Sequence, residues 1–229
     1  MKAEMKLILD KKLIFRIRFG AFALRFVPFL RFAGLNGSVA RGEANDQSDI
    51  DFLIITKRGR VYTARFFATL LIQMIGLRRH GKAVAGRICL NCYLSESSLN
   101  IKPDSLQSVK KVATSNIFLI SLIESDKFYK KFMQENLWMK ELVKKIPEKK
   151  SLAMSDYCQN LSERINRSKP SRPFGLFEPI LSGAIGNFVE NKLMAYQVSR
   201  IKRGKKVGDE TLSTKDQIKL HPKKAKGGP

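Results

Sequence analysis

Two aspartates open an almost uninterrupted apolar run, and this arrangement constrains the fold more than any other feature. Asp49 and Asp51 lead into Phe52-Leu53-Ile54-Ile55, and a spacer of ten residues separates them from Gly37-Ser38. Aspartate is depleted in strands, whereas a short continuous apolar run is typical of a strand buried on both faces. Residues two apart on a strand point to the same face, so the carboxylates of Asp49 and Asp51 are predicted to lie side by side.

Neighbouring carboxylates repel each other unless a cation lies between them. Mg²⁺ suits this arrangement, because it takes oxygen ligands and keeps room for substrate phosphates. Gly37 would let the backbone approach a phosphate closely, and Ser38 would offer it a hydroxyl and an amide. The pattern therefore predicts phosphate chemistry with Mg²⁺ bound by Asp49 and Asp51.

The net charge points to an anionic partner. The chain has 43 Lys and Arg against 20 Asp and Glu, a formal charge of +23. Such an excess favours nucleic acid, nucleotides or an anionic membrane surface, although a generally basic background would also account for it. The basic residues Arg78, Lys82 and Arg87 flank a predicted strand and could draw phosphates to the site, or form a solvated loop.

We expect no transmembrane segment, because no apolar run approaches the roughly 20 residues needed. Residues 13–32 come nearest, but Pro28 and four arginines interrupt them. Peripheral membrane contact through 6–26 or 176–203 is the less favoured interpretation. Core-facing helices with extended basic side chains explain both segments.

The three cysteines, Cys89, Cys92 and Cys158, are too few for a disulfide framework, which favours a reducing cytoplasm. Cys89 and Cys92 are three residues apart on a predicted strand and should point to opposite faces. We therefore interpret them as small core thiols rather than a zinc clamp.

Periodicity and turn residues predict a small α/β layer followed by a helical half. The layer comprises helices, a helical turn and strands in the order helix 6–26, strand 30–35, turn 38–43, strand 49–56, helix 63–75 and strand 87–95. Helical periodicity then covers 105–146, and a further helix covers 176–203. The remaining tail is polar and basic and is expected to be extended or partly disordered. The predicted division is a first domain over 1–103, a helical domain over 104–203 and the tail over 204–229.

Gly37-Ser38, the ten-residue spacer and Asp49-Ile50-Asp51 together resemble the signature of the polymerase-beta-like nucleotidyltransferase superfamily. The sequence is also similar to a branch of stand-alone nucleotidyltransferase-domain proteins. This second similarity rests on Ala40-Arg41-Gly42-Glu43, the strand 88–95 and the pair His221-Pro222. The resemblance implies an α+β fold, in which flanking helices cover a small mixed sheet and a mainly helical C-terminal half follows.

The resemblance implies an enzyme that transfers a nucleoside monophosphate from an NTP to an acceptor hydroxyl and releases pyrophosphate. Asp49 and Asp51 would be the catalytic, Mg²⁺-binding residues, and Gly37, Ser38 and Arg41 would bind the nucleotide. The acceptor stays open among RNA, a protein and a small molecule.

The superfamily pattern also implies a third carboxylate on the next strand, but 87–95 contains neither Asp nor Glu. Asn91 stands at the most suitable position, and Glu96 and Glu43 are alternatives. An amide oxygen can ligate a metal but cannot act as a base. The alternative function is therefore a catalytically weak or inactive relative that binds RNA or nucleotide, supported by the charge of +23.

Overall fold

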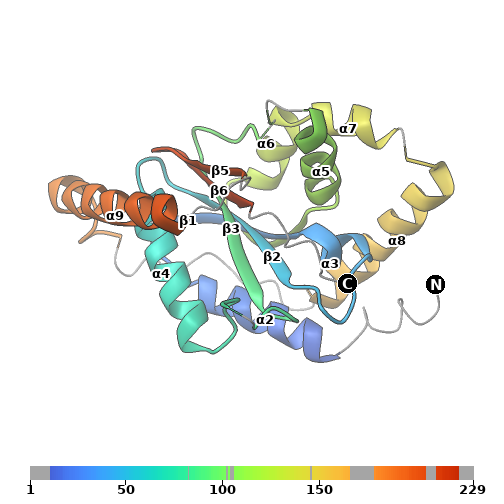
Figure 1. Cartoon of the computed structure of the whole chain (residues 1–229), viewed down its shortest axis with the longest axis horizontal. Coiled ribbons are helices and arrows are strands. Elements are labelled where there is room, and N and C mark those ends of the chain that lie inside the picture. Colours follow the sequence, from blue (N-terminus) through green and yellow to red (C-terminus); the bar gives the residue numbers. More distant parts are fainter. Residues whose placement is uncertain are drawn as a thin grey trace.

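A mixed six-stranded sheet forms the centre of the molecule in a computed structural model, which describes residues 11–81, 83–101, 103, 106–144, 146–165, 178–204 and 210–221. The strand order is β4-β1-β2-β3-β6-β5 (Figure 1). The strands are β1 Leu30–Asn36, β2 Ile50–Thr56, β3 Ile88–Ser95, β4 Ile120–Glu124, β5 Glu210–Ser213 and β6 Gln217–His221. Only β2 and β3 pair in parallel, and the other neighbours are antiparallel. The predicted α+β class with a mixed sheet is confirmed.

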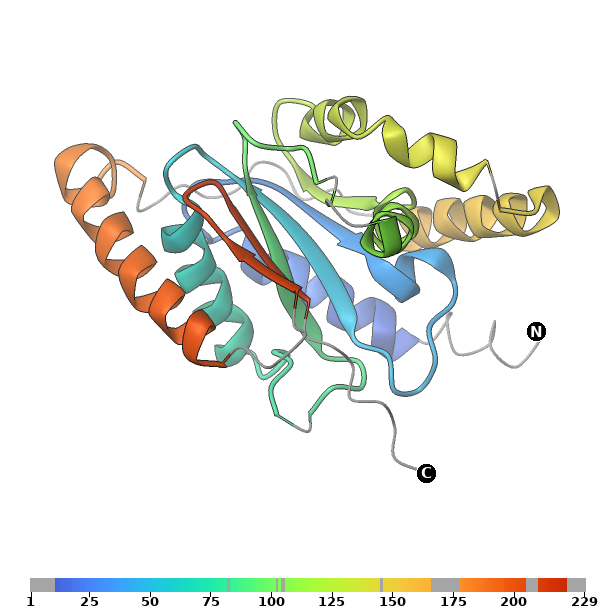
Figure 2. The ribbon, with the colours of Figure 1, turned by 45° about the horizontal axis from the view of Figure 1, so that its top comes forward.

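Helices cover both faces of this sheet (Figure 2). They are α2 Lys11–Leu24, α3 Gly37–Arg41, α4 Val61–Met74, α5 Leu106–Asn116, α6 Phe128–Glu135, α7 Trp138–Val143, α8 Glu148–Ile165 and α9 Gly183–Gly204. Side chains of α2, α4 and α8 share one hydrophobic cluster with one sheet face, and side chains of α5, α6 and α7 share a second with the other.

Strand β2 is buried on both faces, as its apolar run predicts. Phe52 and Ile54 belong to the cluster of α2 and α4, whereas Leu53 and Ile55 belong to the cluster of α5 to α7. All four side chains are fully buried. The run is continuous because alternate side chains enter two different cores, so neither face of β2 is left for polar residues.

The prediction of helix throughout 105–146 is wrong at Ile120–Glu124, which is strand β4. This strand pairs antiparallel with β1, with Leu35 opposite Ile120 and Ala33 opposite Ile123. A short apolar run satisfies helical and strand periodicity about equally well, and pairing with an available neighbour decides between them. Helices α5, α6 and α7 account for the rest of the predicted helical pattern.

The expectation of an extended or disordered tail is also wrong for 210–221, which forms the hairpin β5–β6. Strand β6 pairs with β3, placing the buried Ile218 opposite Tyr93. Gln217 secures the hairpin, because its Nε2 donates to the Ser98 carbonyl oxygen at 2.9 Å. One buried isoleucine in a polar segment is a weak sequence signal. The sheet thus takes strands from all three predicted segments, and the domain boundaries stay a prediction.

Helix α2 turns only part of its apolar side chains to the core, although the sequence predicts a core-facing helix. Ile14, Ile17 and Leu24 are buried, whereas three phenylalanines of the helix face outward with exposed fractions of 38–62%, namely Phe15, Phe19 and Phe22. The aromatic rings pair with each other along the helix, as Phe15 and Phe19 do with centroids 5.6 Å apart. Among the helices that the structure describes, none is long and apolar enough to cross a membrane.

Helix α9 lies beside α4 (Figure 2) and is held there by a buried carboxylate. Glu190 accepts hydrogen bonds from the backbone N–H of Tyr62 at 2.9 Å and of Thr63 at 2.8 Å. The Thr63 hydroxyl adds a third at 2.6 Å. Glu190 therefore satisfies two N–H groups in the first turn of α4, which no residue within that helix can pair.

We expect Glu190→Ala to lower the free energy of unfolding by about 2–3 kcal/mol, because the substitution leaves buried donors without an acceptor. Asn191→Ala, at the exposed neighbouring position of α9, should change it by less than about 0.5 kcal/mol. Urea unfolding followed by circular dichroism measures both. Equal effects of the two substitutions would contradict the capping role of Glu190.

Candidate active site

The sheet register brings three polar side chains together at the start of β2. Asp51 lies opposite Asn36 of β1 and opposite Cys89 of β3. Residues directly opposite each other on neighbouring strands share a face of the sheet. This is also the face of Leu53 and Ile55, which α5 to α7 cover farther along the strand.

Asp49, Asp51 and Cys89 form a compact group that could hold a metal ion. One carboxylate oxygen from each aspartate and the Cys89 sulfur all lie within 4.8 Å of one another. Arg79 Nη1 donates to Asp49 Oδ2 at 2.5 Å and contacts Cys89 Sγ at 3.5 Å. On the other side, Asn91 Nδ2 donates to Asp51 Oδ1 at 3.0 Å.

Gly37 allows Asp51 to occupy its position. The backbone of Gly37 has φ +74°, and a Cβ at this position would overlap the Oδ2 atom of Asp51. Both the left-handed conformation and the close approach therefore require glycine. The space of the missing side chain holds the carboxylate, so the turn and the acidic pair form one unit.

Burial, followed by the neighbouring charge of Asp49, raises the pKa of Asp51 from 3.8 to about 7. Burial also raises the pKa of the Cys89 thiol, and the two aspartates add to that shift. A divalent cation between Asp49 and Asp51 would offset both burial and repulsion. The oxygen donors, their spacing and their electrostatic state therefore fit such a cation.

A family model for the nucleotidyltransferase domain matches residues 30–150, which is more than half of the 229 residues. The chain belongs to this nucleotidyltransferase family. The matched segment contains Gly37-Ser38, Asp49 and Asp51, so the resemblance seen in the sequence is confirmed. Comparisons with curated proteins and with solved structures gave no significant match.

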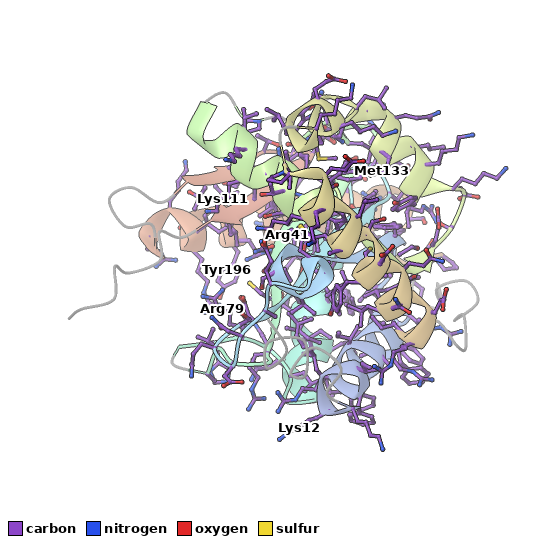
Figure 3. All side chains as sticks on the ribbon, turned by 90° about the vertical axis from the view of Figure 1, so that its right-hand side faces the viewer. Lys12, Arg41, Arg79, Lys111, Met133 and Tyr196 are labelled. Atoms are coloured by element: carbon purple, nitrogen blue, oxygen red, sulfur yellow. The ribbon has the colours of Figure 1, made fainter. Side chains whose placement is uncertain are left out.

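Ser38 and Arg41, two of the residues predicted to bind the nucleotide, have different surroundings in this nucleotidyltransferase domain. Ser38 follows Gly37 in α3 and is half-buried. Arg41 instead donates from Nε to Glu43 at 2.9 Å and from Nη1 to the Thr114 carbonyl oxygen at 3.2 Å. In Figure 3, Arg41 lies at α3, and Arg79 lies lower, toward the loop between α4 and β3. Arg41 is thus paired with Glu43 and Thr114, and its nucleotide-binding role stays a prediction.

Of the three candidates for the third carboxylate position, only Asn91 lies at the aspartates. Glu43 is bound by Arg41 and by Lys150, whose Nζ is 2.9 Å from Glu43 Oε1. Glu96 follows the opposite end of β3 and accepts a hydrogen bond from the backbone N–H of Arg58 at 3.1 Å. Both glutamates therefore contribute to other contacts, and Asn91 is bound to Asp51 as a donor.

Three residues at the site, Asn36, Arg79 and Cys89, were not predicted as functional. Arg79 is placed by its backbone N–H, which donates to the Ile88 carbonyl oxygen at 2.9 Å. Arg87, which the sequence suggested, turns to the Gly76 carbonyl oxygen, and Lys82 lies outside the described residues. The loop contains several basic residues, and only the three-dimensional register distinguishes Arg79 from them.

The raised pKa of Asp51 predicts a pH-dependent stability for the cation-free protein. A carboxyl group that binds its proton more tightly in the folded state destabilises the fold once it ionises. The stability of the wild type should therefore fall between about pH 4 and 7, and Asp51→Asn should remove that fall. We expect the variant to gain about 2 kcal/mol relative to wild type between pH 5 and pH 8 in EDTA.

Urea unfolding at the two pH values measures this difference. Asp46→Asn is the matched control, because Asp46 is an exposed aspartate of the preceding loop. Added Mg²⁺ should stabilise the wild type more than Asp51→Asn at pH 8. A pH dependence shared equally by wild type and Asp51→Asn would contradict the raised pKa.

Proposed function

We propose that this family member transfers a nucleoside monophosphate from an NTP to an acceptor hydroxyl and releases pyrophosphate, using Mg²⁺ held by Asp49 and Asp51. The observation that carries the proposal is the packing of Asp51 against Gly37, with Asp49 alongside. This unit combines a cation site with an adjacent backbone turn that lacks a side chain. It lies inside the segment that matches the nucleotidyltransferase domain.

The residues around the acidic pair have distinct proposed roles. Bound Mg²⁺ would supply charge neutralisation at the triphosphate. Asp49 and Asp51 hold the cation, and Gly37 leaves the backbone open to a phosphate oxygen. Ser38 would donate to that phosphate through its hydroxyl and its backbone N–H.

Arg79 adds a guanidinium to the same site. In the cation-free protein it neutralises Asp49 through the 2.5 Å contact. Once Asp49 binds a cation, Arg79 would be free to donate to phosphate oxygens, for which the planar guanidinium is well suited. Arg79 thus takes the role that the sequence suggested for its neighbours in the basic loop.

The acceptor stays open among RNA, a protein and a small molecule. The net charge of +23 favours an anionic acceptor, because clustered positive charge raises its local concentration. We place the protein in the reducing cytoplasm on the basis of its three free thiols, Cys89, Cys92 and Cys158.

One observation favours a second candidate function, a weakly active or inactive member that binds RNA or nucleotide. Asn91 occupies the strand position next to Asp51 and donates a hydrogen bond to it. An amide orients the carboxylate but cannot accept the proton of an attacking hydroxyl. An asparagine in place of the third carboxylate would therefore reduce turnover more than nucleotide binding.

The joint variant Asp49→Ala/Asp51→Ala tests the enzyme. We expect at least a 100-fold loss of Mg²⁺-dependent pyrophosphate release, because the variant removes both charged cation ligands. The assay combines labelled NTPs with RNA, protein and small-molecule acceptors. Asp46→Ala, in the exposed loop before the site, should release pyrophosphate at the wild-type rate.

Pyrophosphate release that survives in the double variant would contradict the roles of Asp49 and Asp51. The second candidate makes a different prediction: wild type and double variant both fail to turn over, and both bind RNA with the same steep salt dependence. A filter-binding titration between low and physiological salt measures that dependence.

A further inference from the structure

Asn36 is a buried polar residue beside the acidic pair that the proposed mechanism does not use. It ends β1 immediately before Gly37, lies opposite Asp51 in the register, and has an exposed fraction of 6%. Directly opposed residues have Cβ atoms about 4.5–5.5 Å apart and share a face of the sheet. The Asn36 side chain therefore lies next to the carboxylate of Asp51.

A chain of amide hydrogen bonds fixes the orientation of Asn36. Asn116 Nδ2 donates to the Val112 carbonyl oxygen at 2.8 Å, which leaves Asn116 Oδ1 as an acceptor. Asn36 Nδ2 donates to that oxygen at 2.9 Å. A flipped Asn36 amide would place two acceptor oxygens against each other, so the network determines which atom of Asn36 is the oxygen.

The Asn36 oxygen is left without a partner by this arrangement. Oδ1 is buried and accepts no hydrogen bond from any residue that the structure describes. Asn36 is also the N-cap residue of α3, where an asparagine oxygen usually accepts from the first helical turn, but its side chain makes no such bond. Buried acceptors in native proteins are almost always satisfied, so this oxygen calls for a ligand.

The network also sets the direction of the oxygen. The two polar atoms of a planar amide diverge, and Nδ2 points toward Asn116. Asn116 leads into β4, which pairs with β1 on the side opposite β2. Oδ1 therefore points away from Asn116, and Asp51 lies opposite Asn36 on the neighbouring strand β2. The ionised carboxylate and the amide oxygen are both acceptors, so a cation between them would satisfy both.

We infer that Asn36 Oδ1 is a third oxygen ligand of the cation held by Asp49 and Asp51, an inference that rests on the proposed function. Asparagine oxygens are suitable ligands for hard divalent cations. Asn36 thus supplies a third oxygen ligand from β1, but it carries no charge. Strand β3 lacks the third carboxylate that the superfamily pattern implies.

Binding of Mn²⁺ to the full chain, measured by calorimetry, tests this assignment. We expect Asn36→Leu to weaken binding about 10-fold, because the variant removes the proposed oxygen ligand. Asn191→Leu, on the exposed surface of α9, is the matched control and should bind Mn²⁺ like the wild type. Circular dichroism in EDTA confirms that each variant is folded.

Tb³⁺ luminescence lifetimes in H₂O and D₂O provide a second measurement, because they count the waters bound to the ion. Asn36→Leu removes a proposed protein ligand, so one more water should bind the ion in that variant. Asn191→Leu removes no ligand and should leave the number of bound waters unchanged. A purely structural role of Asn36 would change stability without changing this count. If Asn36→Leu does not fold, Asn36→Ala decides, since wild-type Mn²⁺ binding with an unchanged water count in that variant overturns the inference.

Two further outcomes separate this inference from the proposed function. Mn²⁺ binding that Asp49→Ala/Asp51→Ala abolishes, but that Asn36→Leu leaves unchanged with the same water count, overturns the Asn36 assignment alone. A wild-type chain with no saturable Mn²⁺ site overturns both the assignment and the cation-dependent function.

Discussion

The packing of Asp51 against Gly37 is the contact on which the arrangement of the site depends. It places a carboxylate in the space that any other residue at position 37 would fill. Burial at this place is unfavourable for the charge, as the raised pKa of Asp51 shows. The surrounding groups reduce that cost, since Asn91 donates to Asp51 and Arg79 neutralises Asp49. The turn, the strand start and the cationic loop are thus electrostatically interdependent.

The rest of the fold holds this unfavourable arrangement in place. Strand β2 is buried between two hydrophobic clusters and paired on both sides, so its first residues cannot move far toward solvent. Its neighbours then determine what the aspartates meet: Asn36 comes from β1, whereas Cys89 and Asn91 come from β3. A rigid scaffold of this kind keeps site residues in fixed positions without a ligand.

The parts of the fold that sequence reasoning predicted correctly depend on local patterns. The apolar run after Asp51 located β2, and the Gly37-Ser38 turn located the end of β1. Strands β4 and β6 were missed, because Ile120–Glu124 fits two periodicities and Ile218 is an isolated apolar residue. Their strand character comes from pairing with β1 and β3, which no local pattern encodes.

The site residues likewise divide into those that a local sequence pattern reveals and those that only strand pairing reveals. Asp49 and Asp51 are recognisable from their spacing alone, and Asn91 from its place on the next predicted strand. Arg79, Cys89 and Asn36 are not, because their importance follows from register: Arg79 from a backbone bond to Ile88, and the other two from lying opposite Asp51. Residues that support a site from neighbouring strands require the pairing to be known.

The β5–β6 hairpin protects the edge of the sheet against pairing with another molecule. Strand β6 covers the side of β3 that faces away from β2, so β3 is an interior strand and the outer position falls to the four-residue β5 (Figure 2). An unpaired strand edge is a template for pairing with another molecule, and short edge strands limit that hazard. A version of the chain without the hairpin would present the backbone of β3 as an open edge, where a strand of another copy could pair.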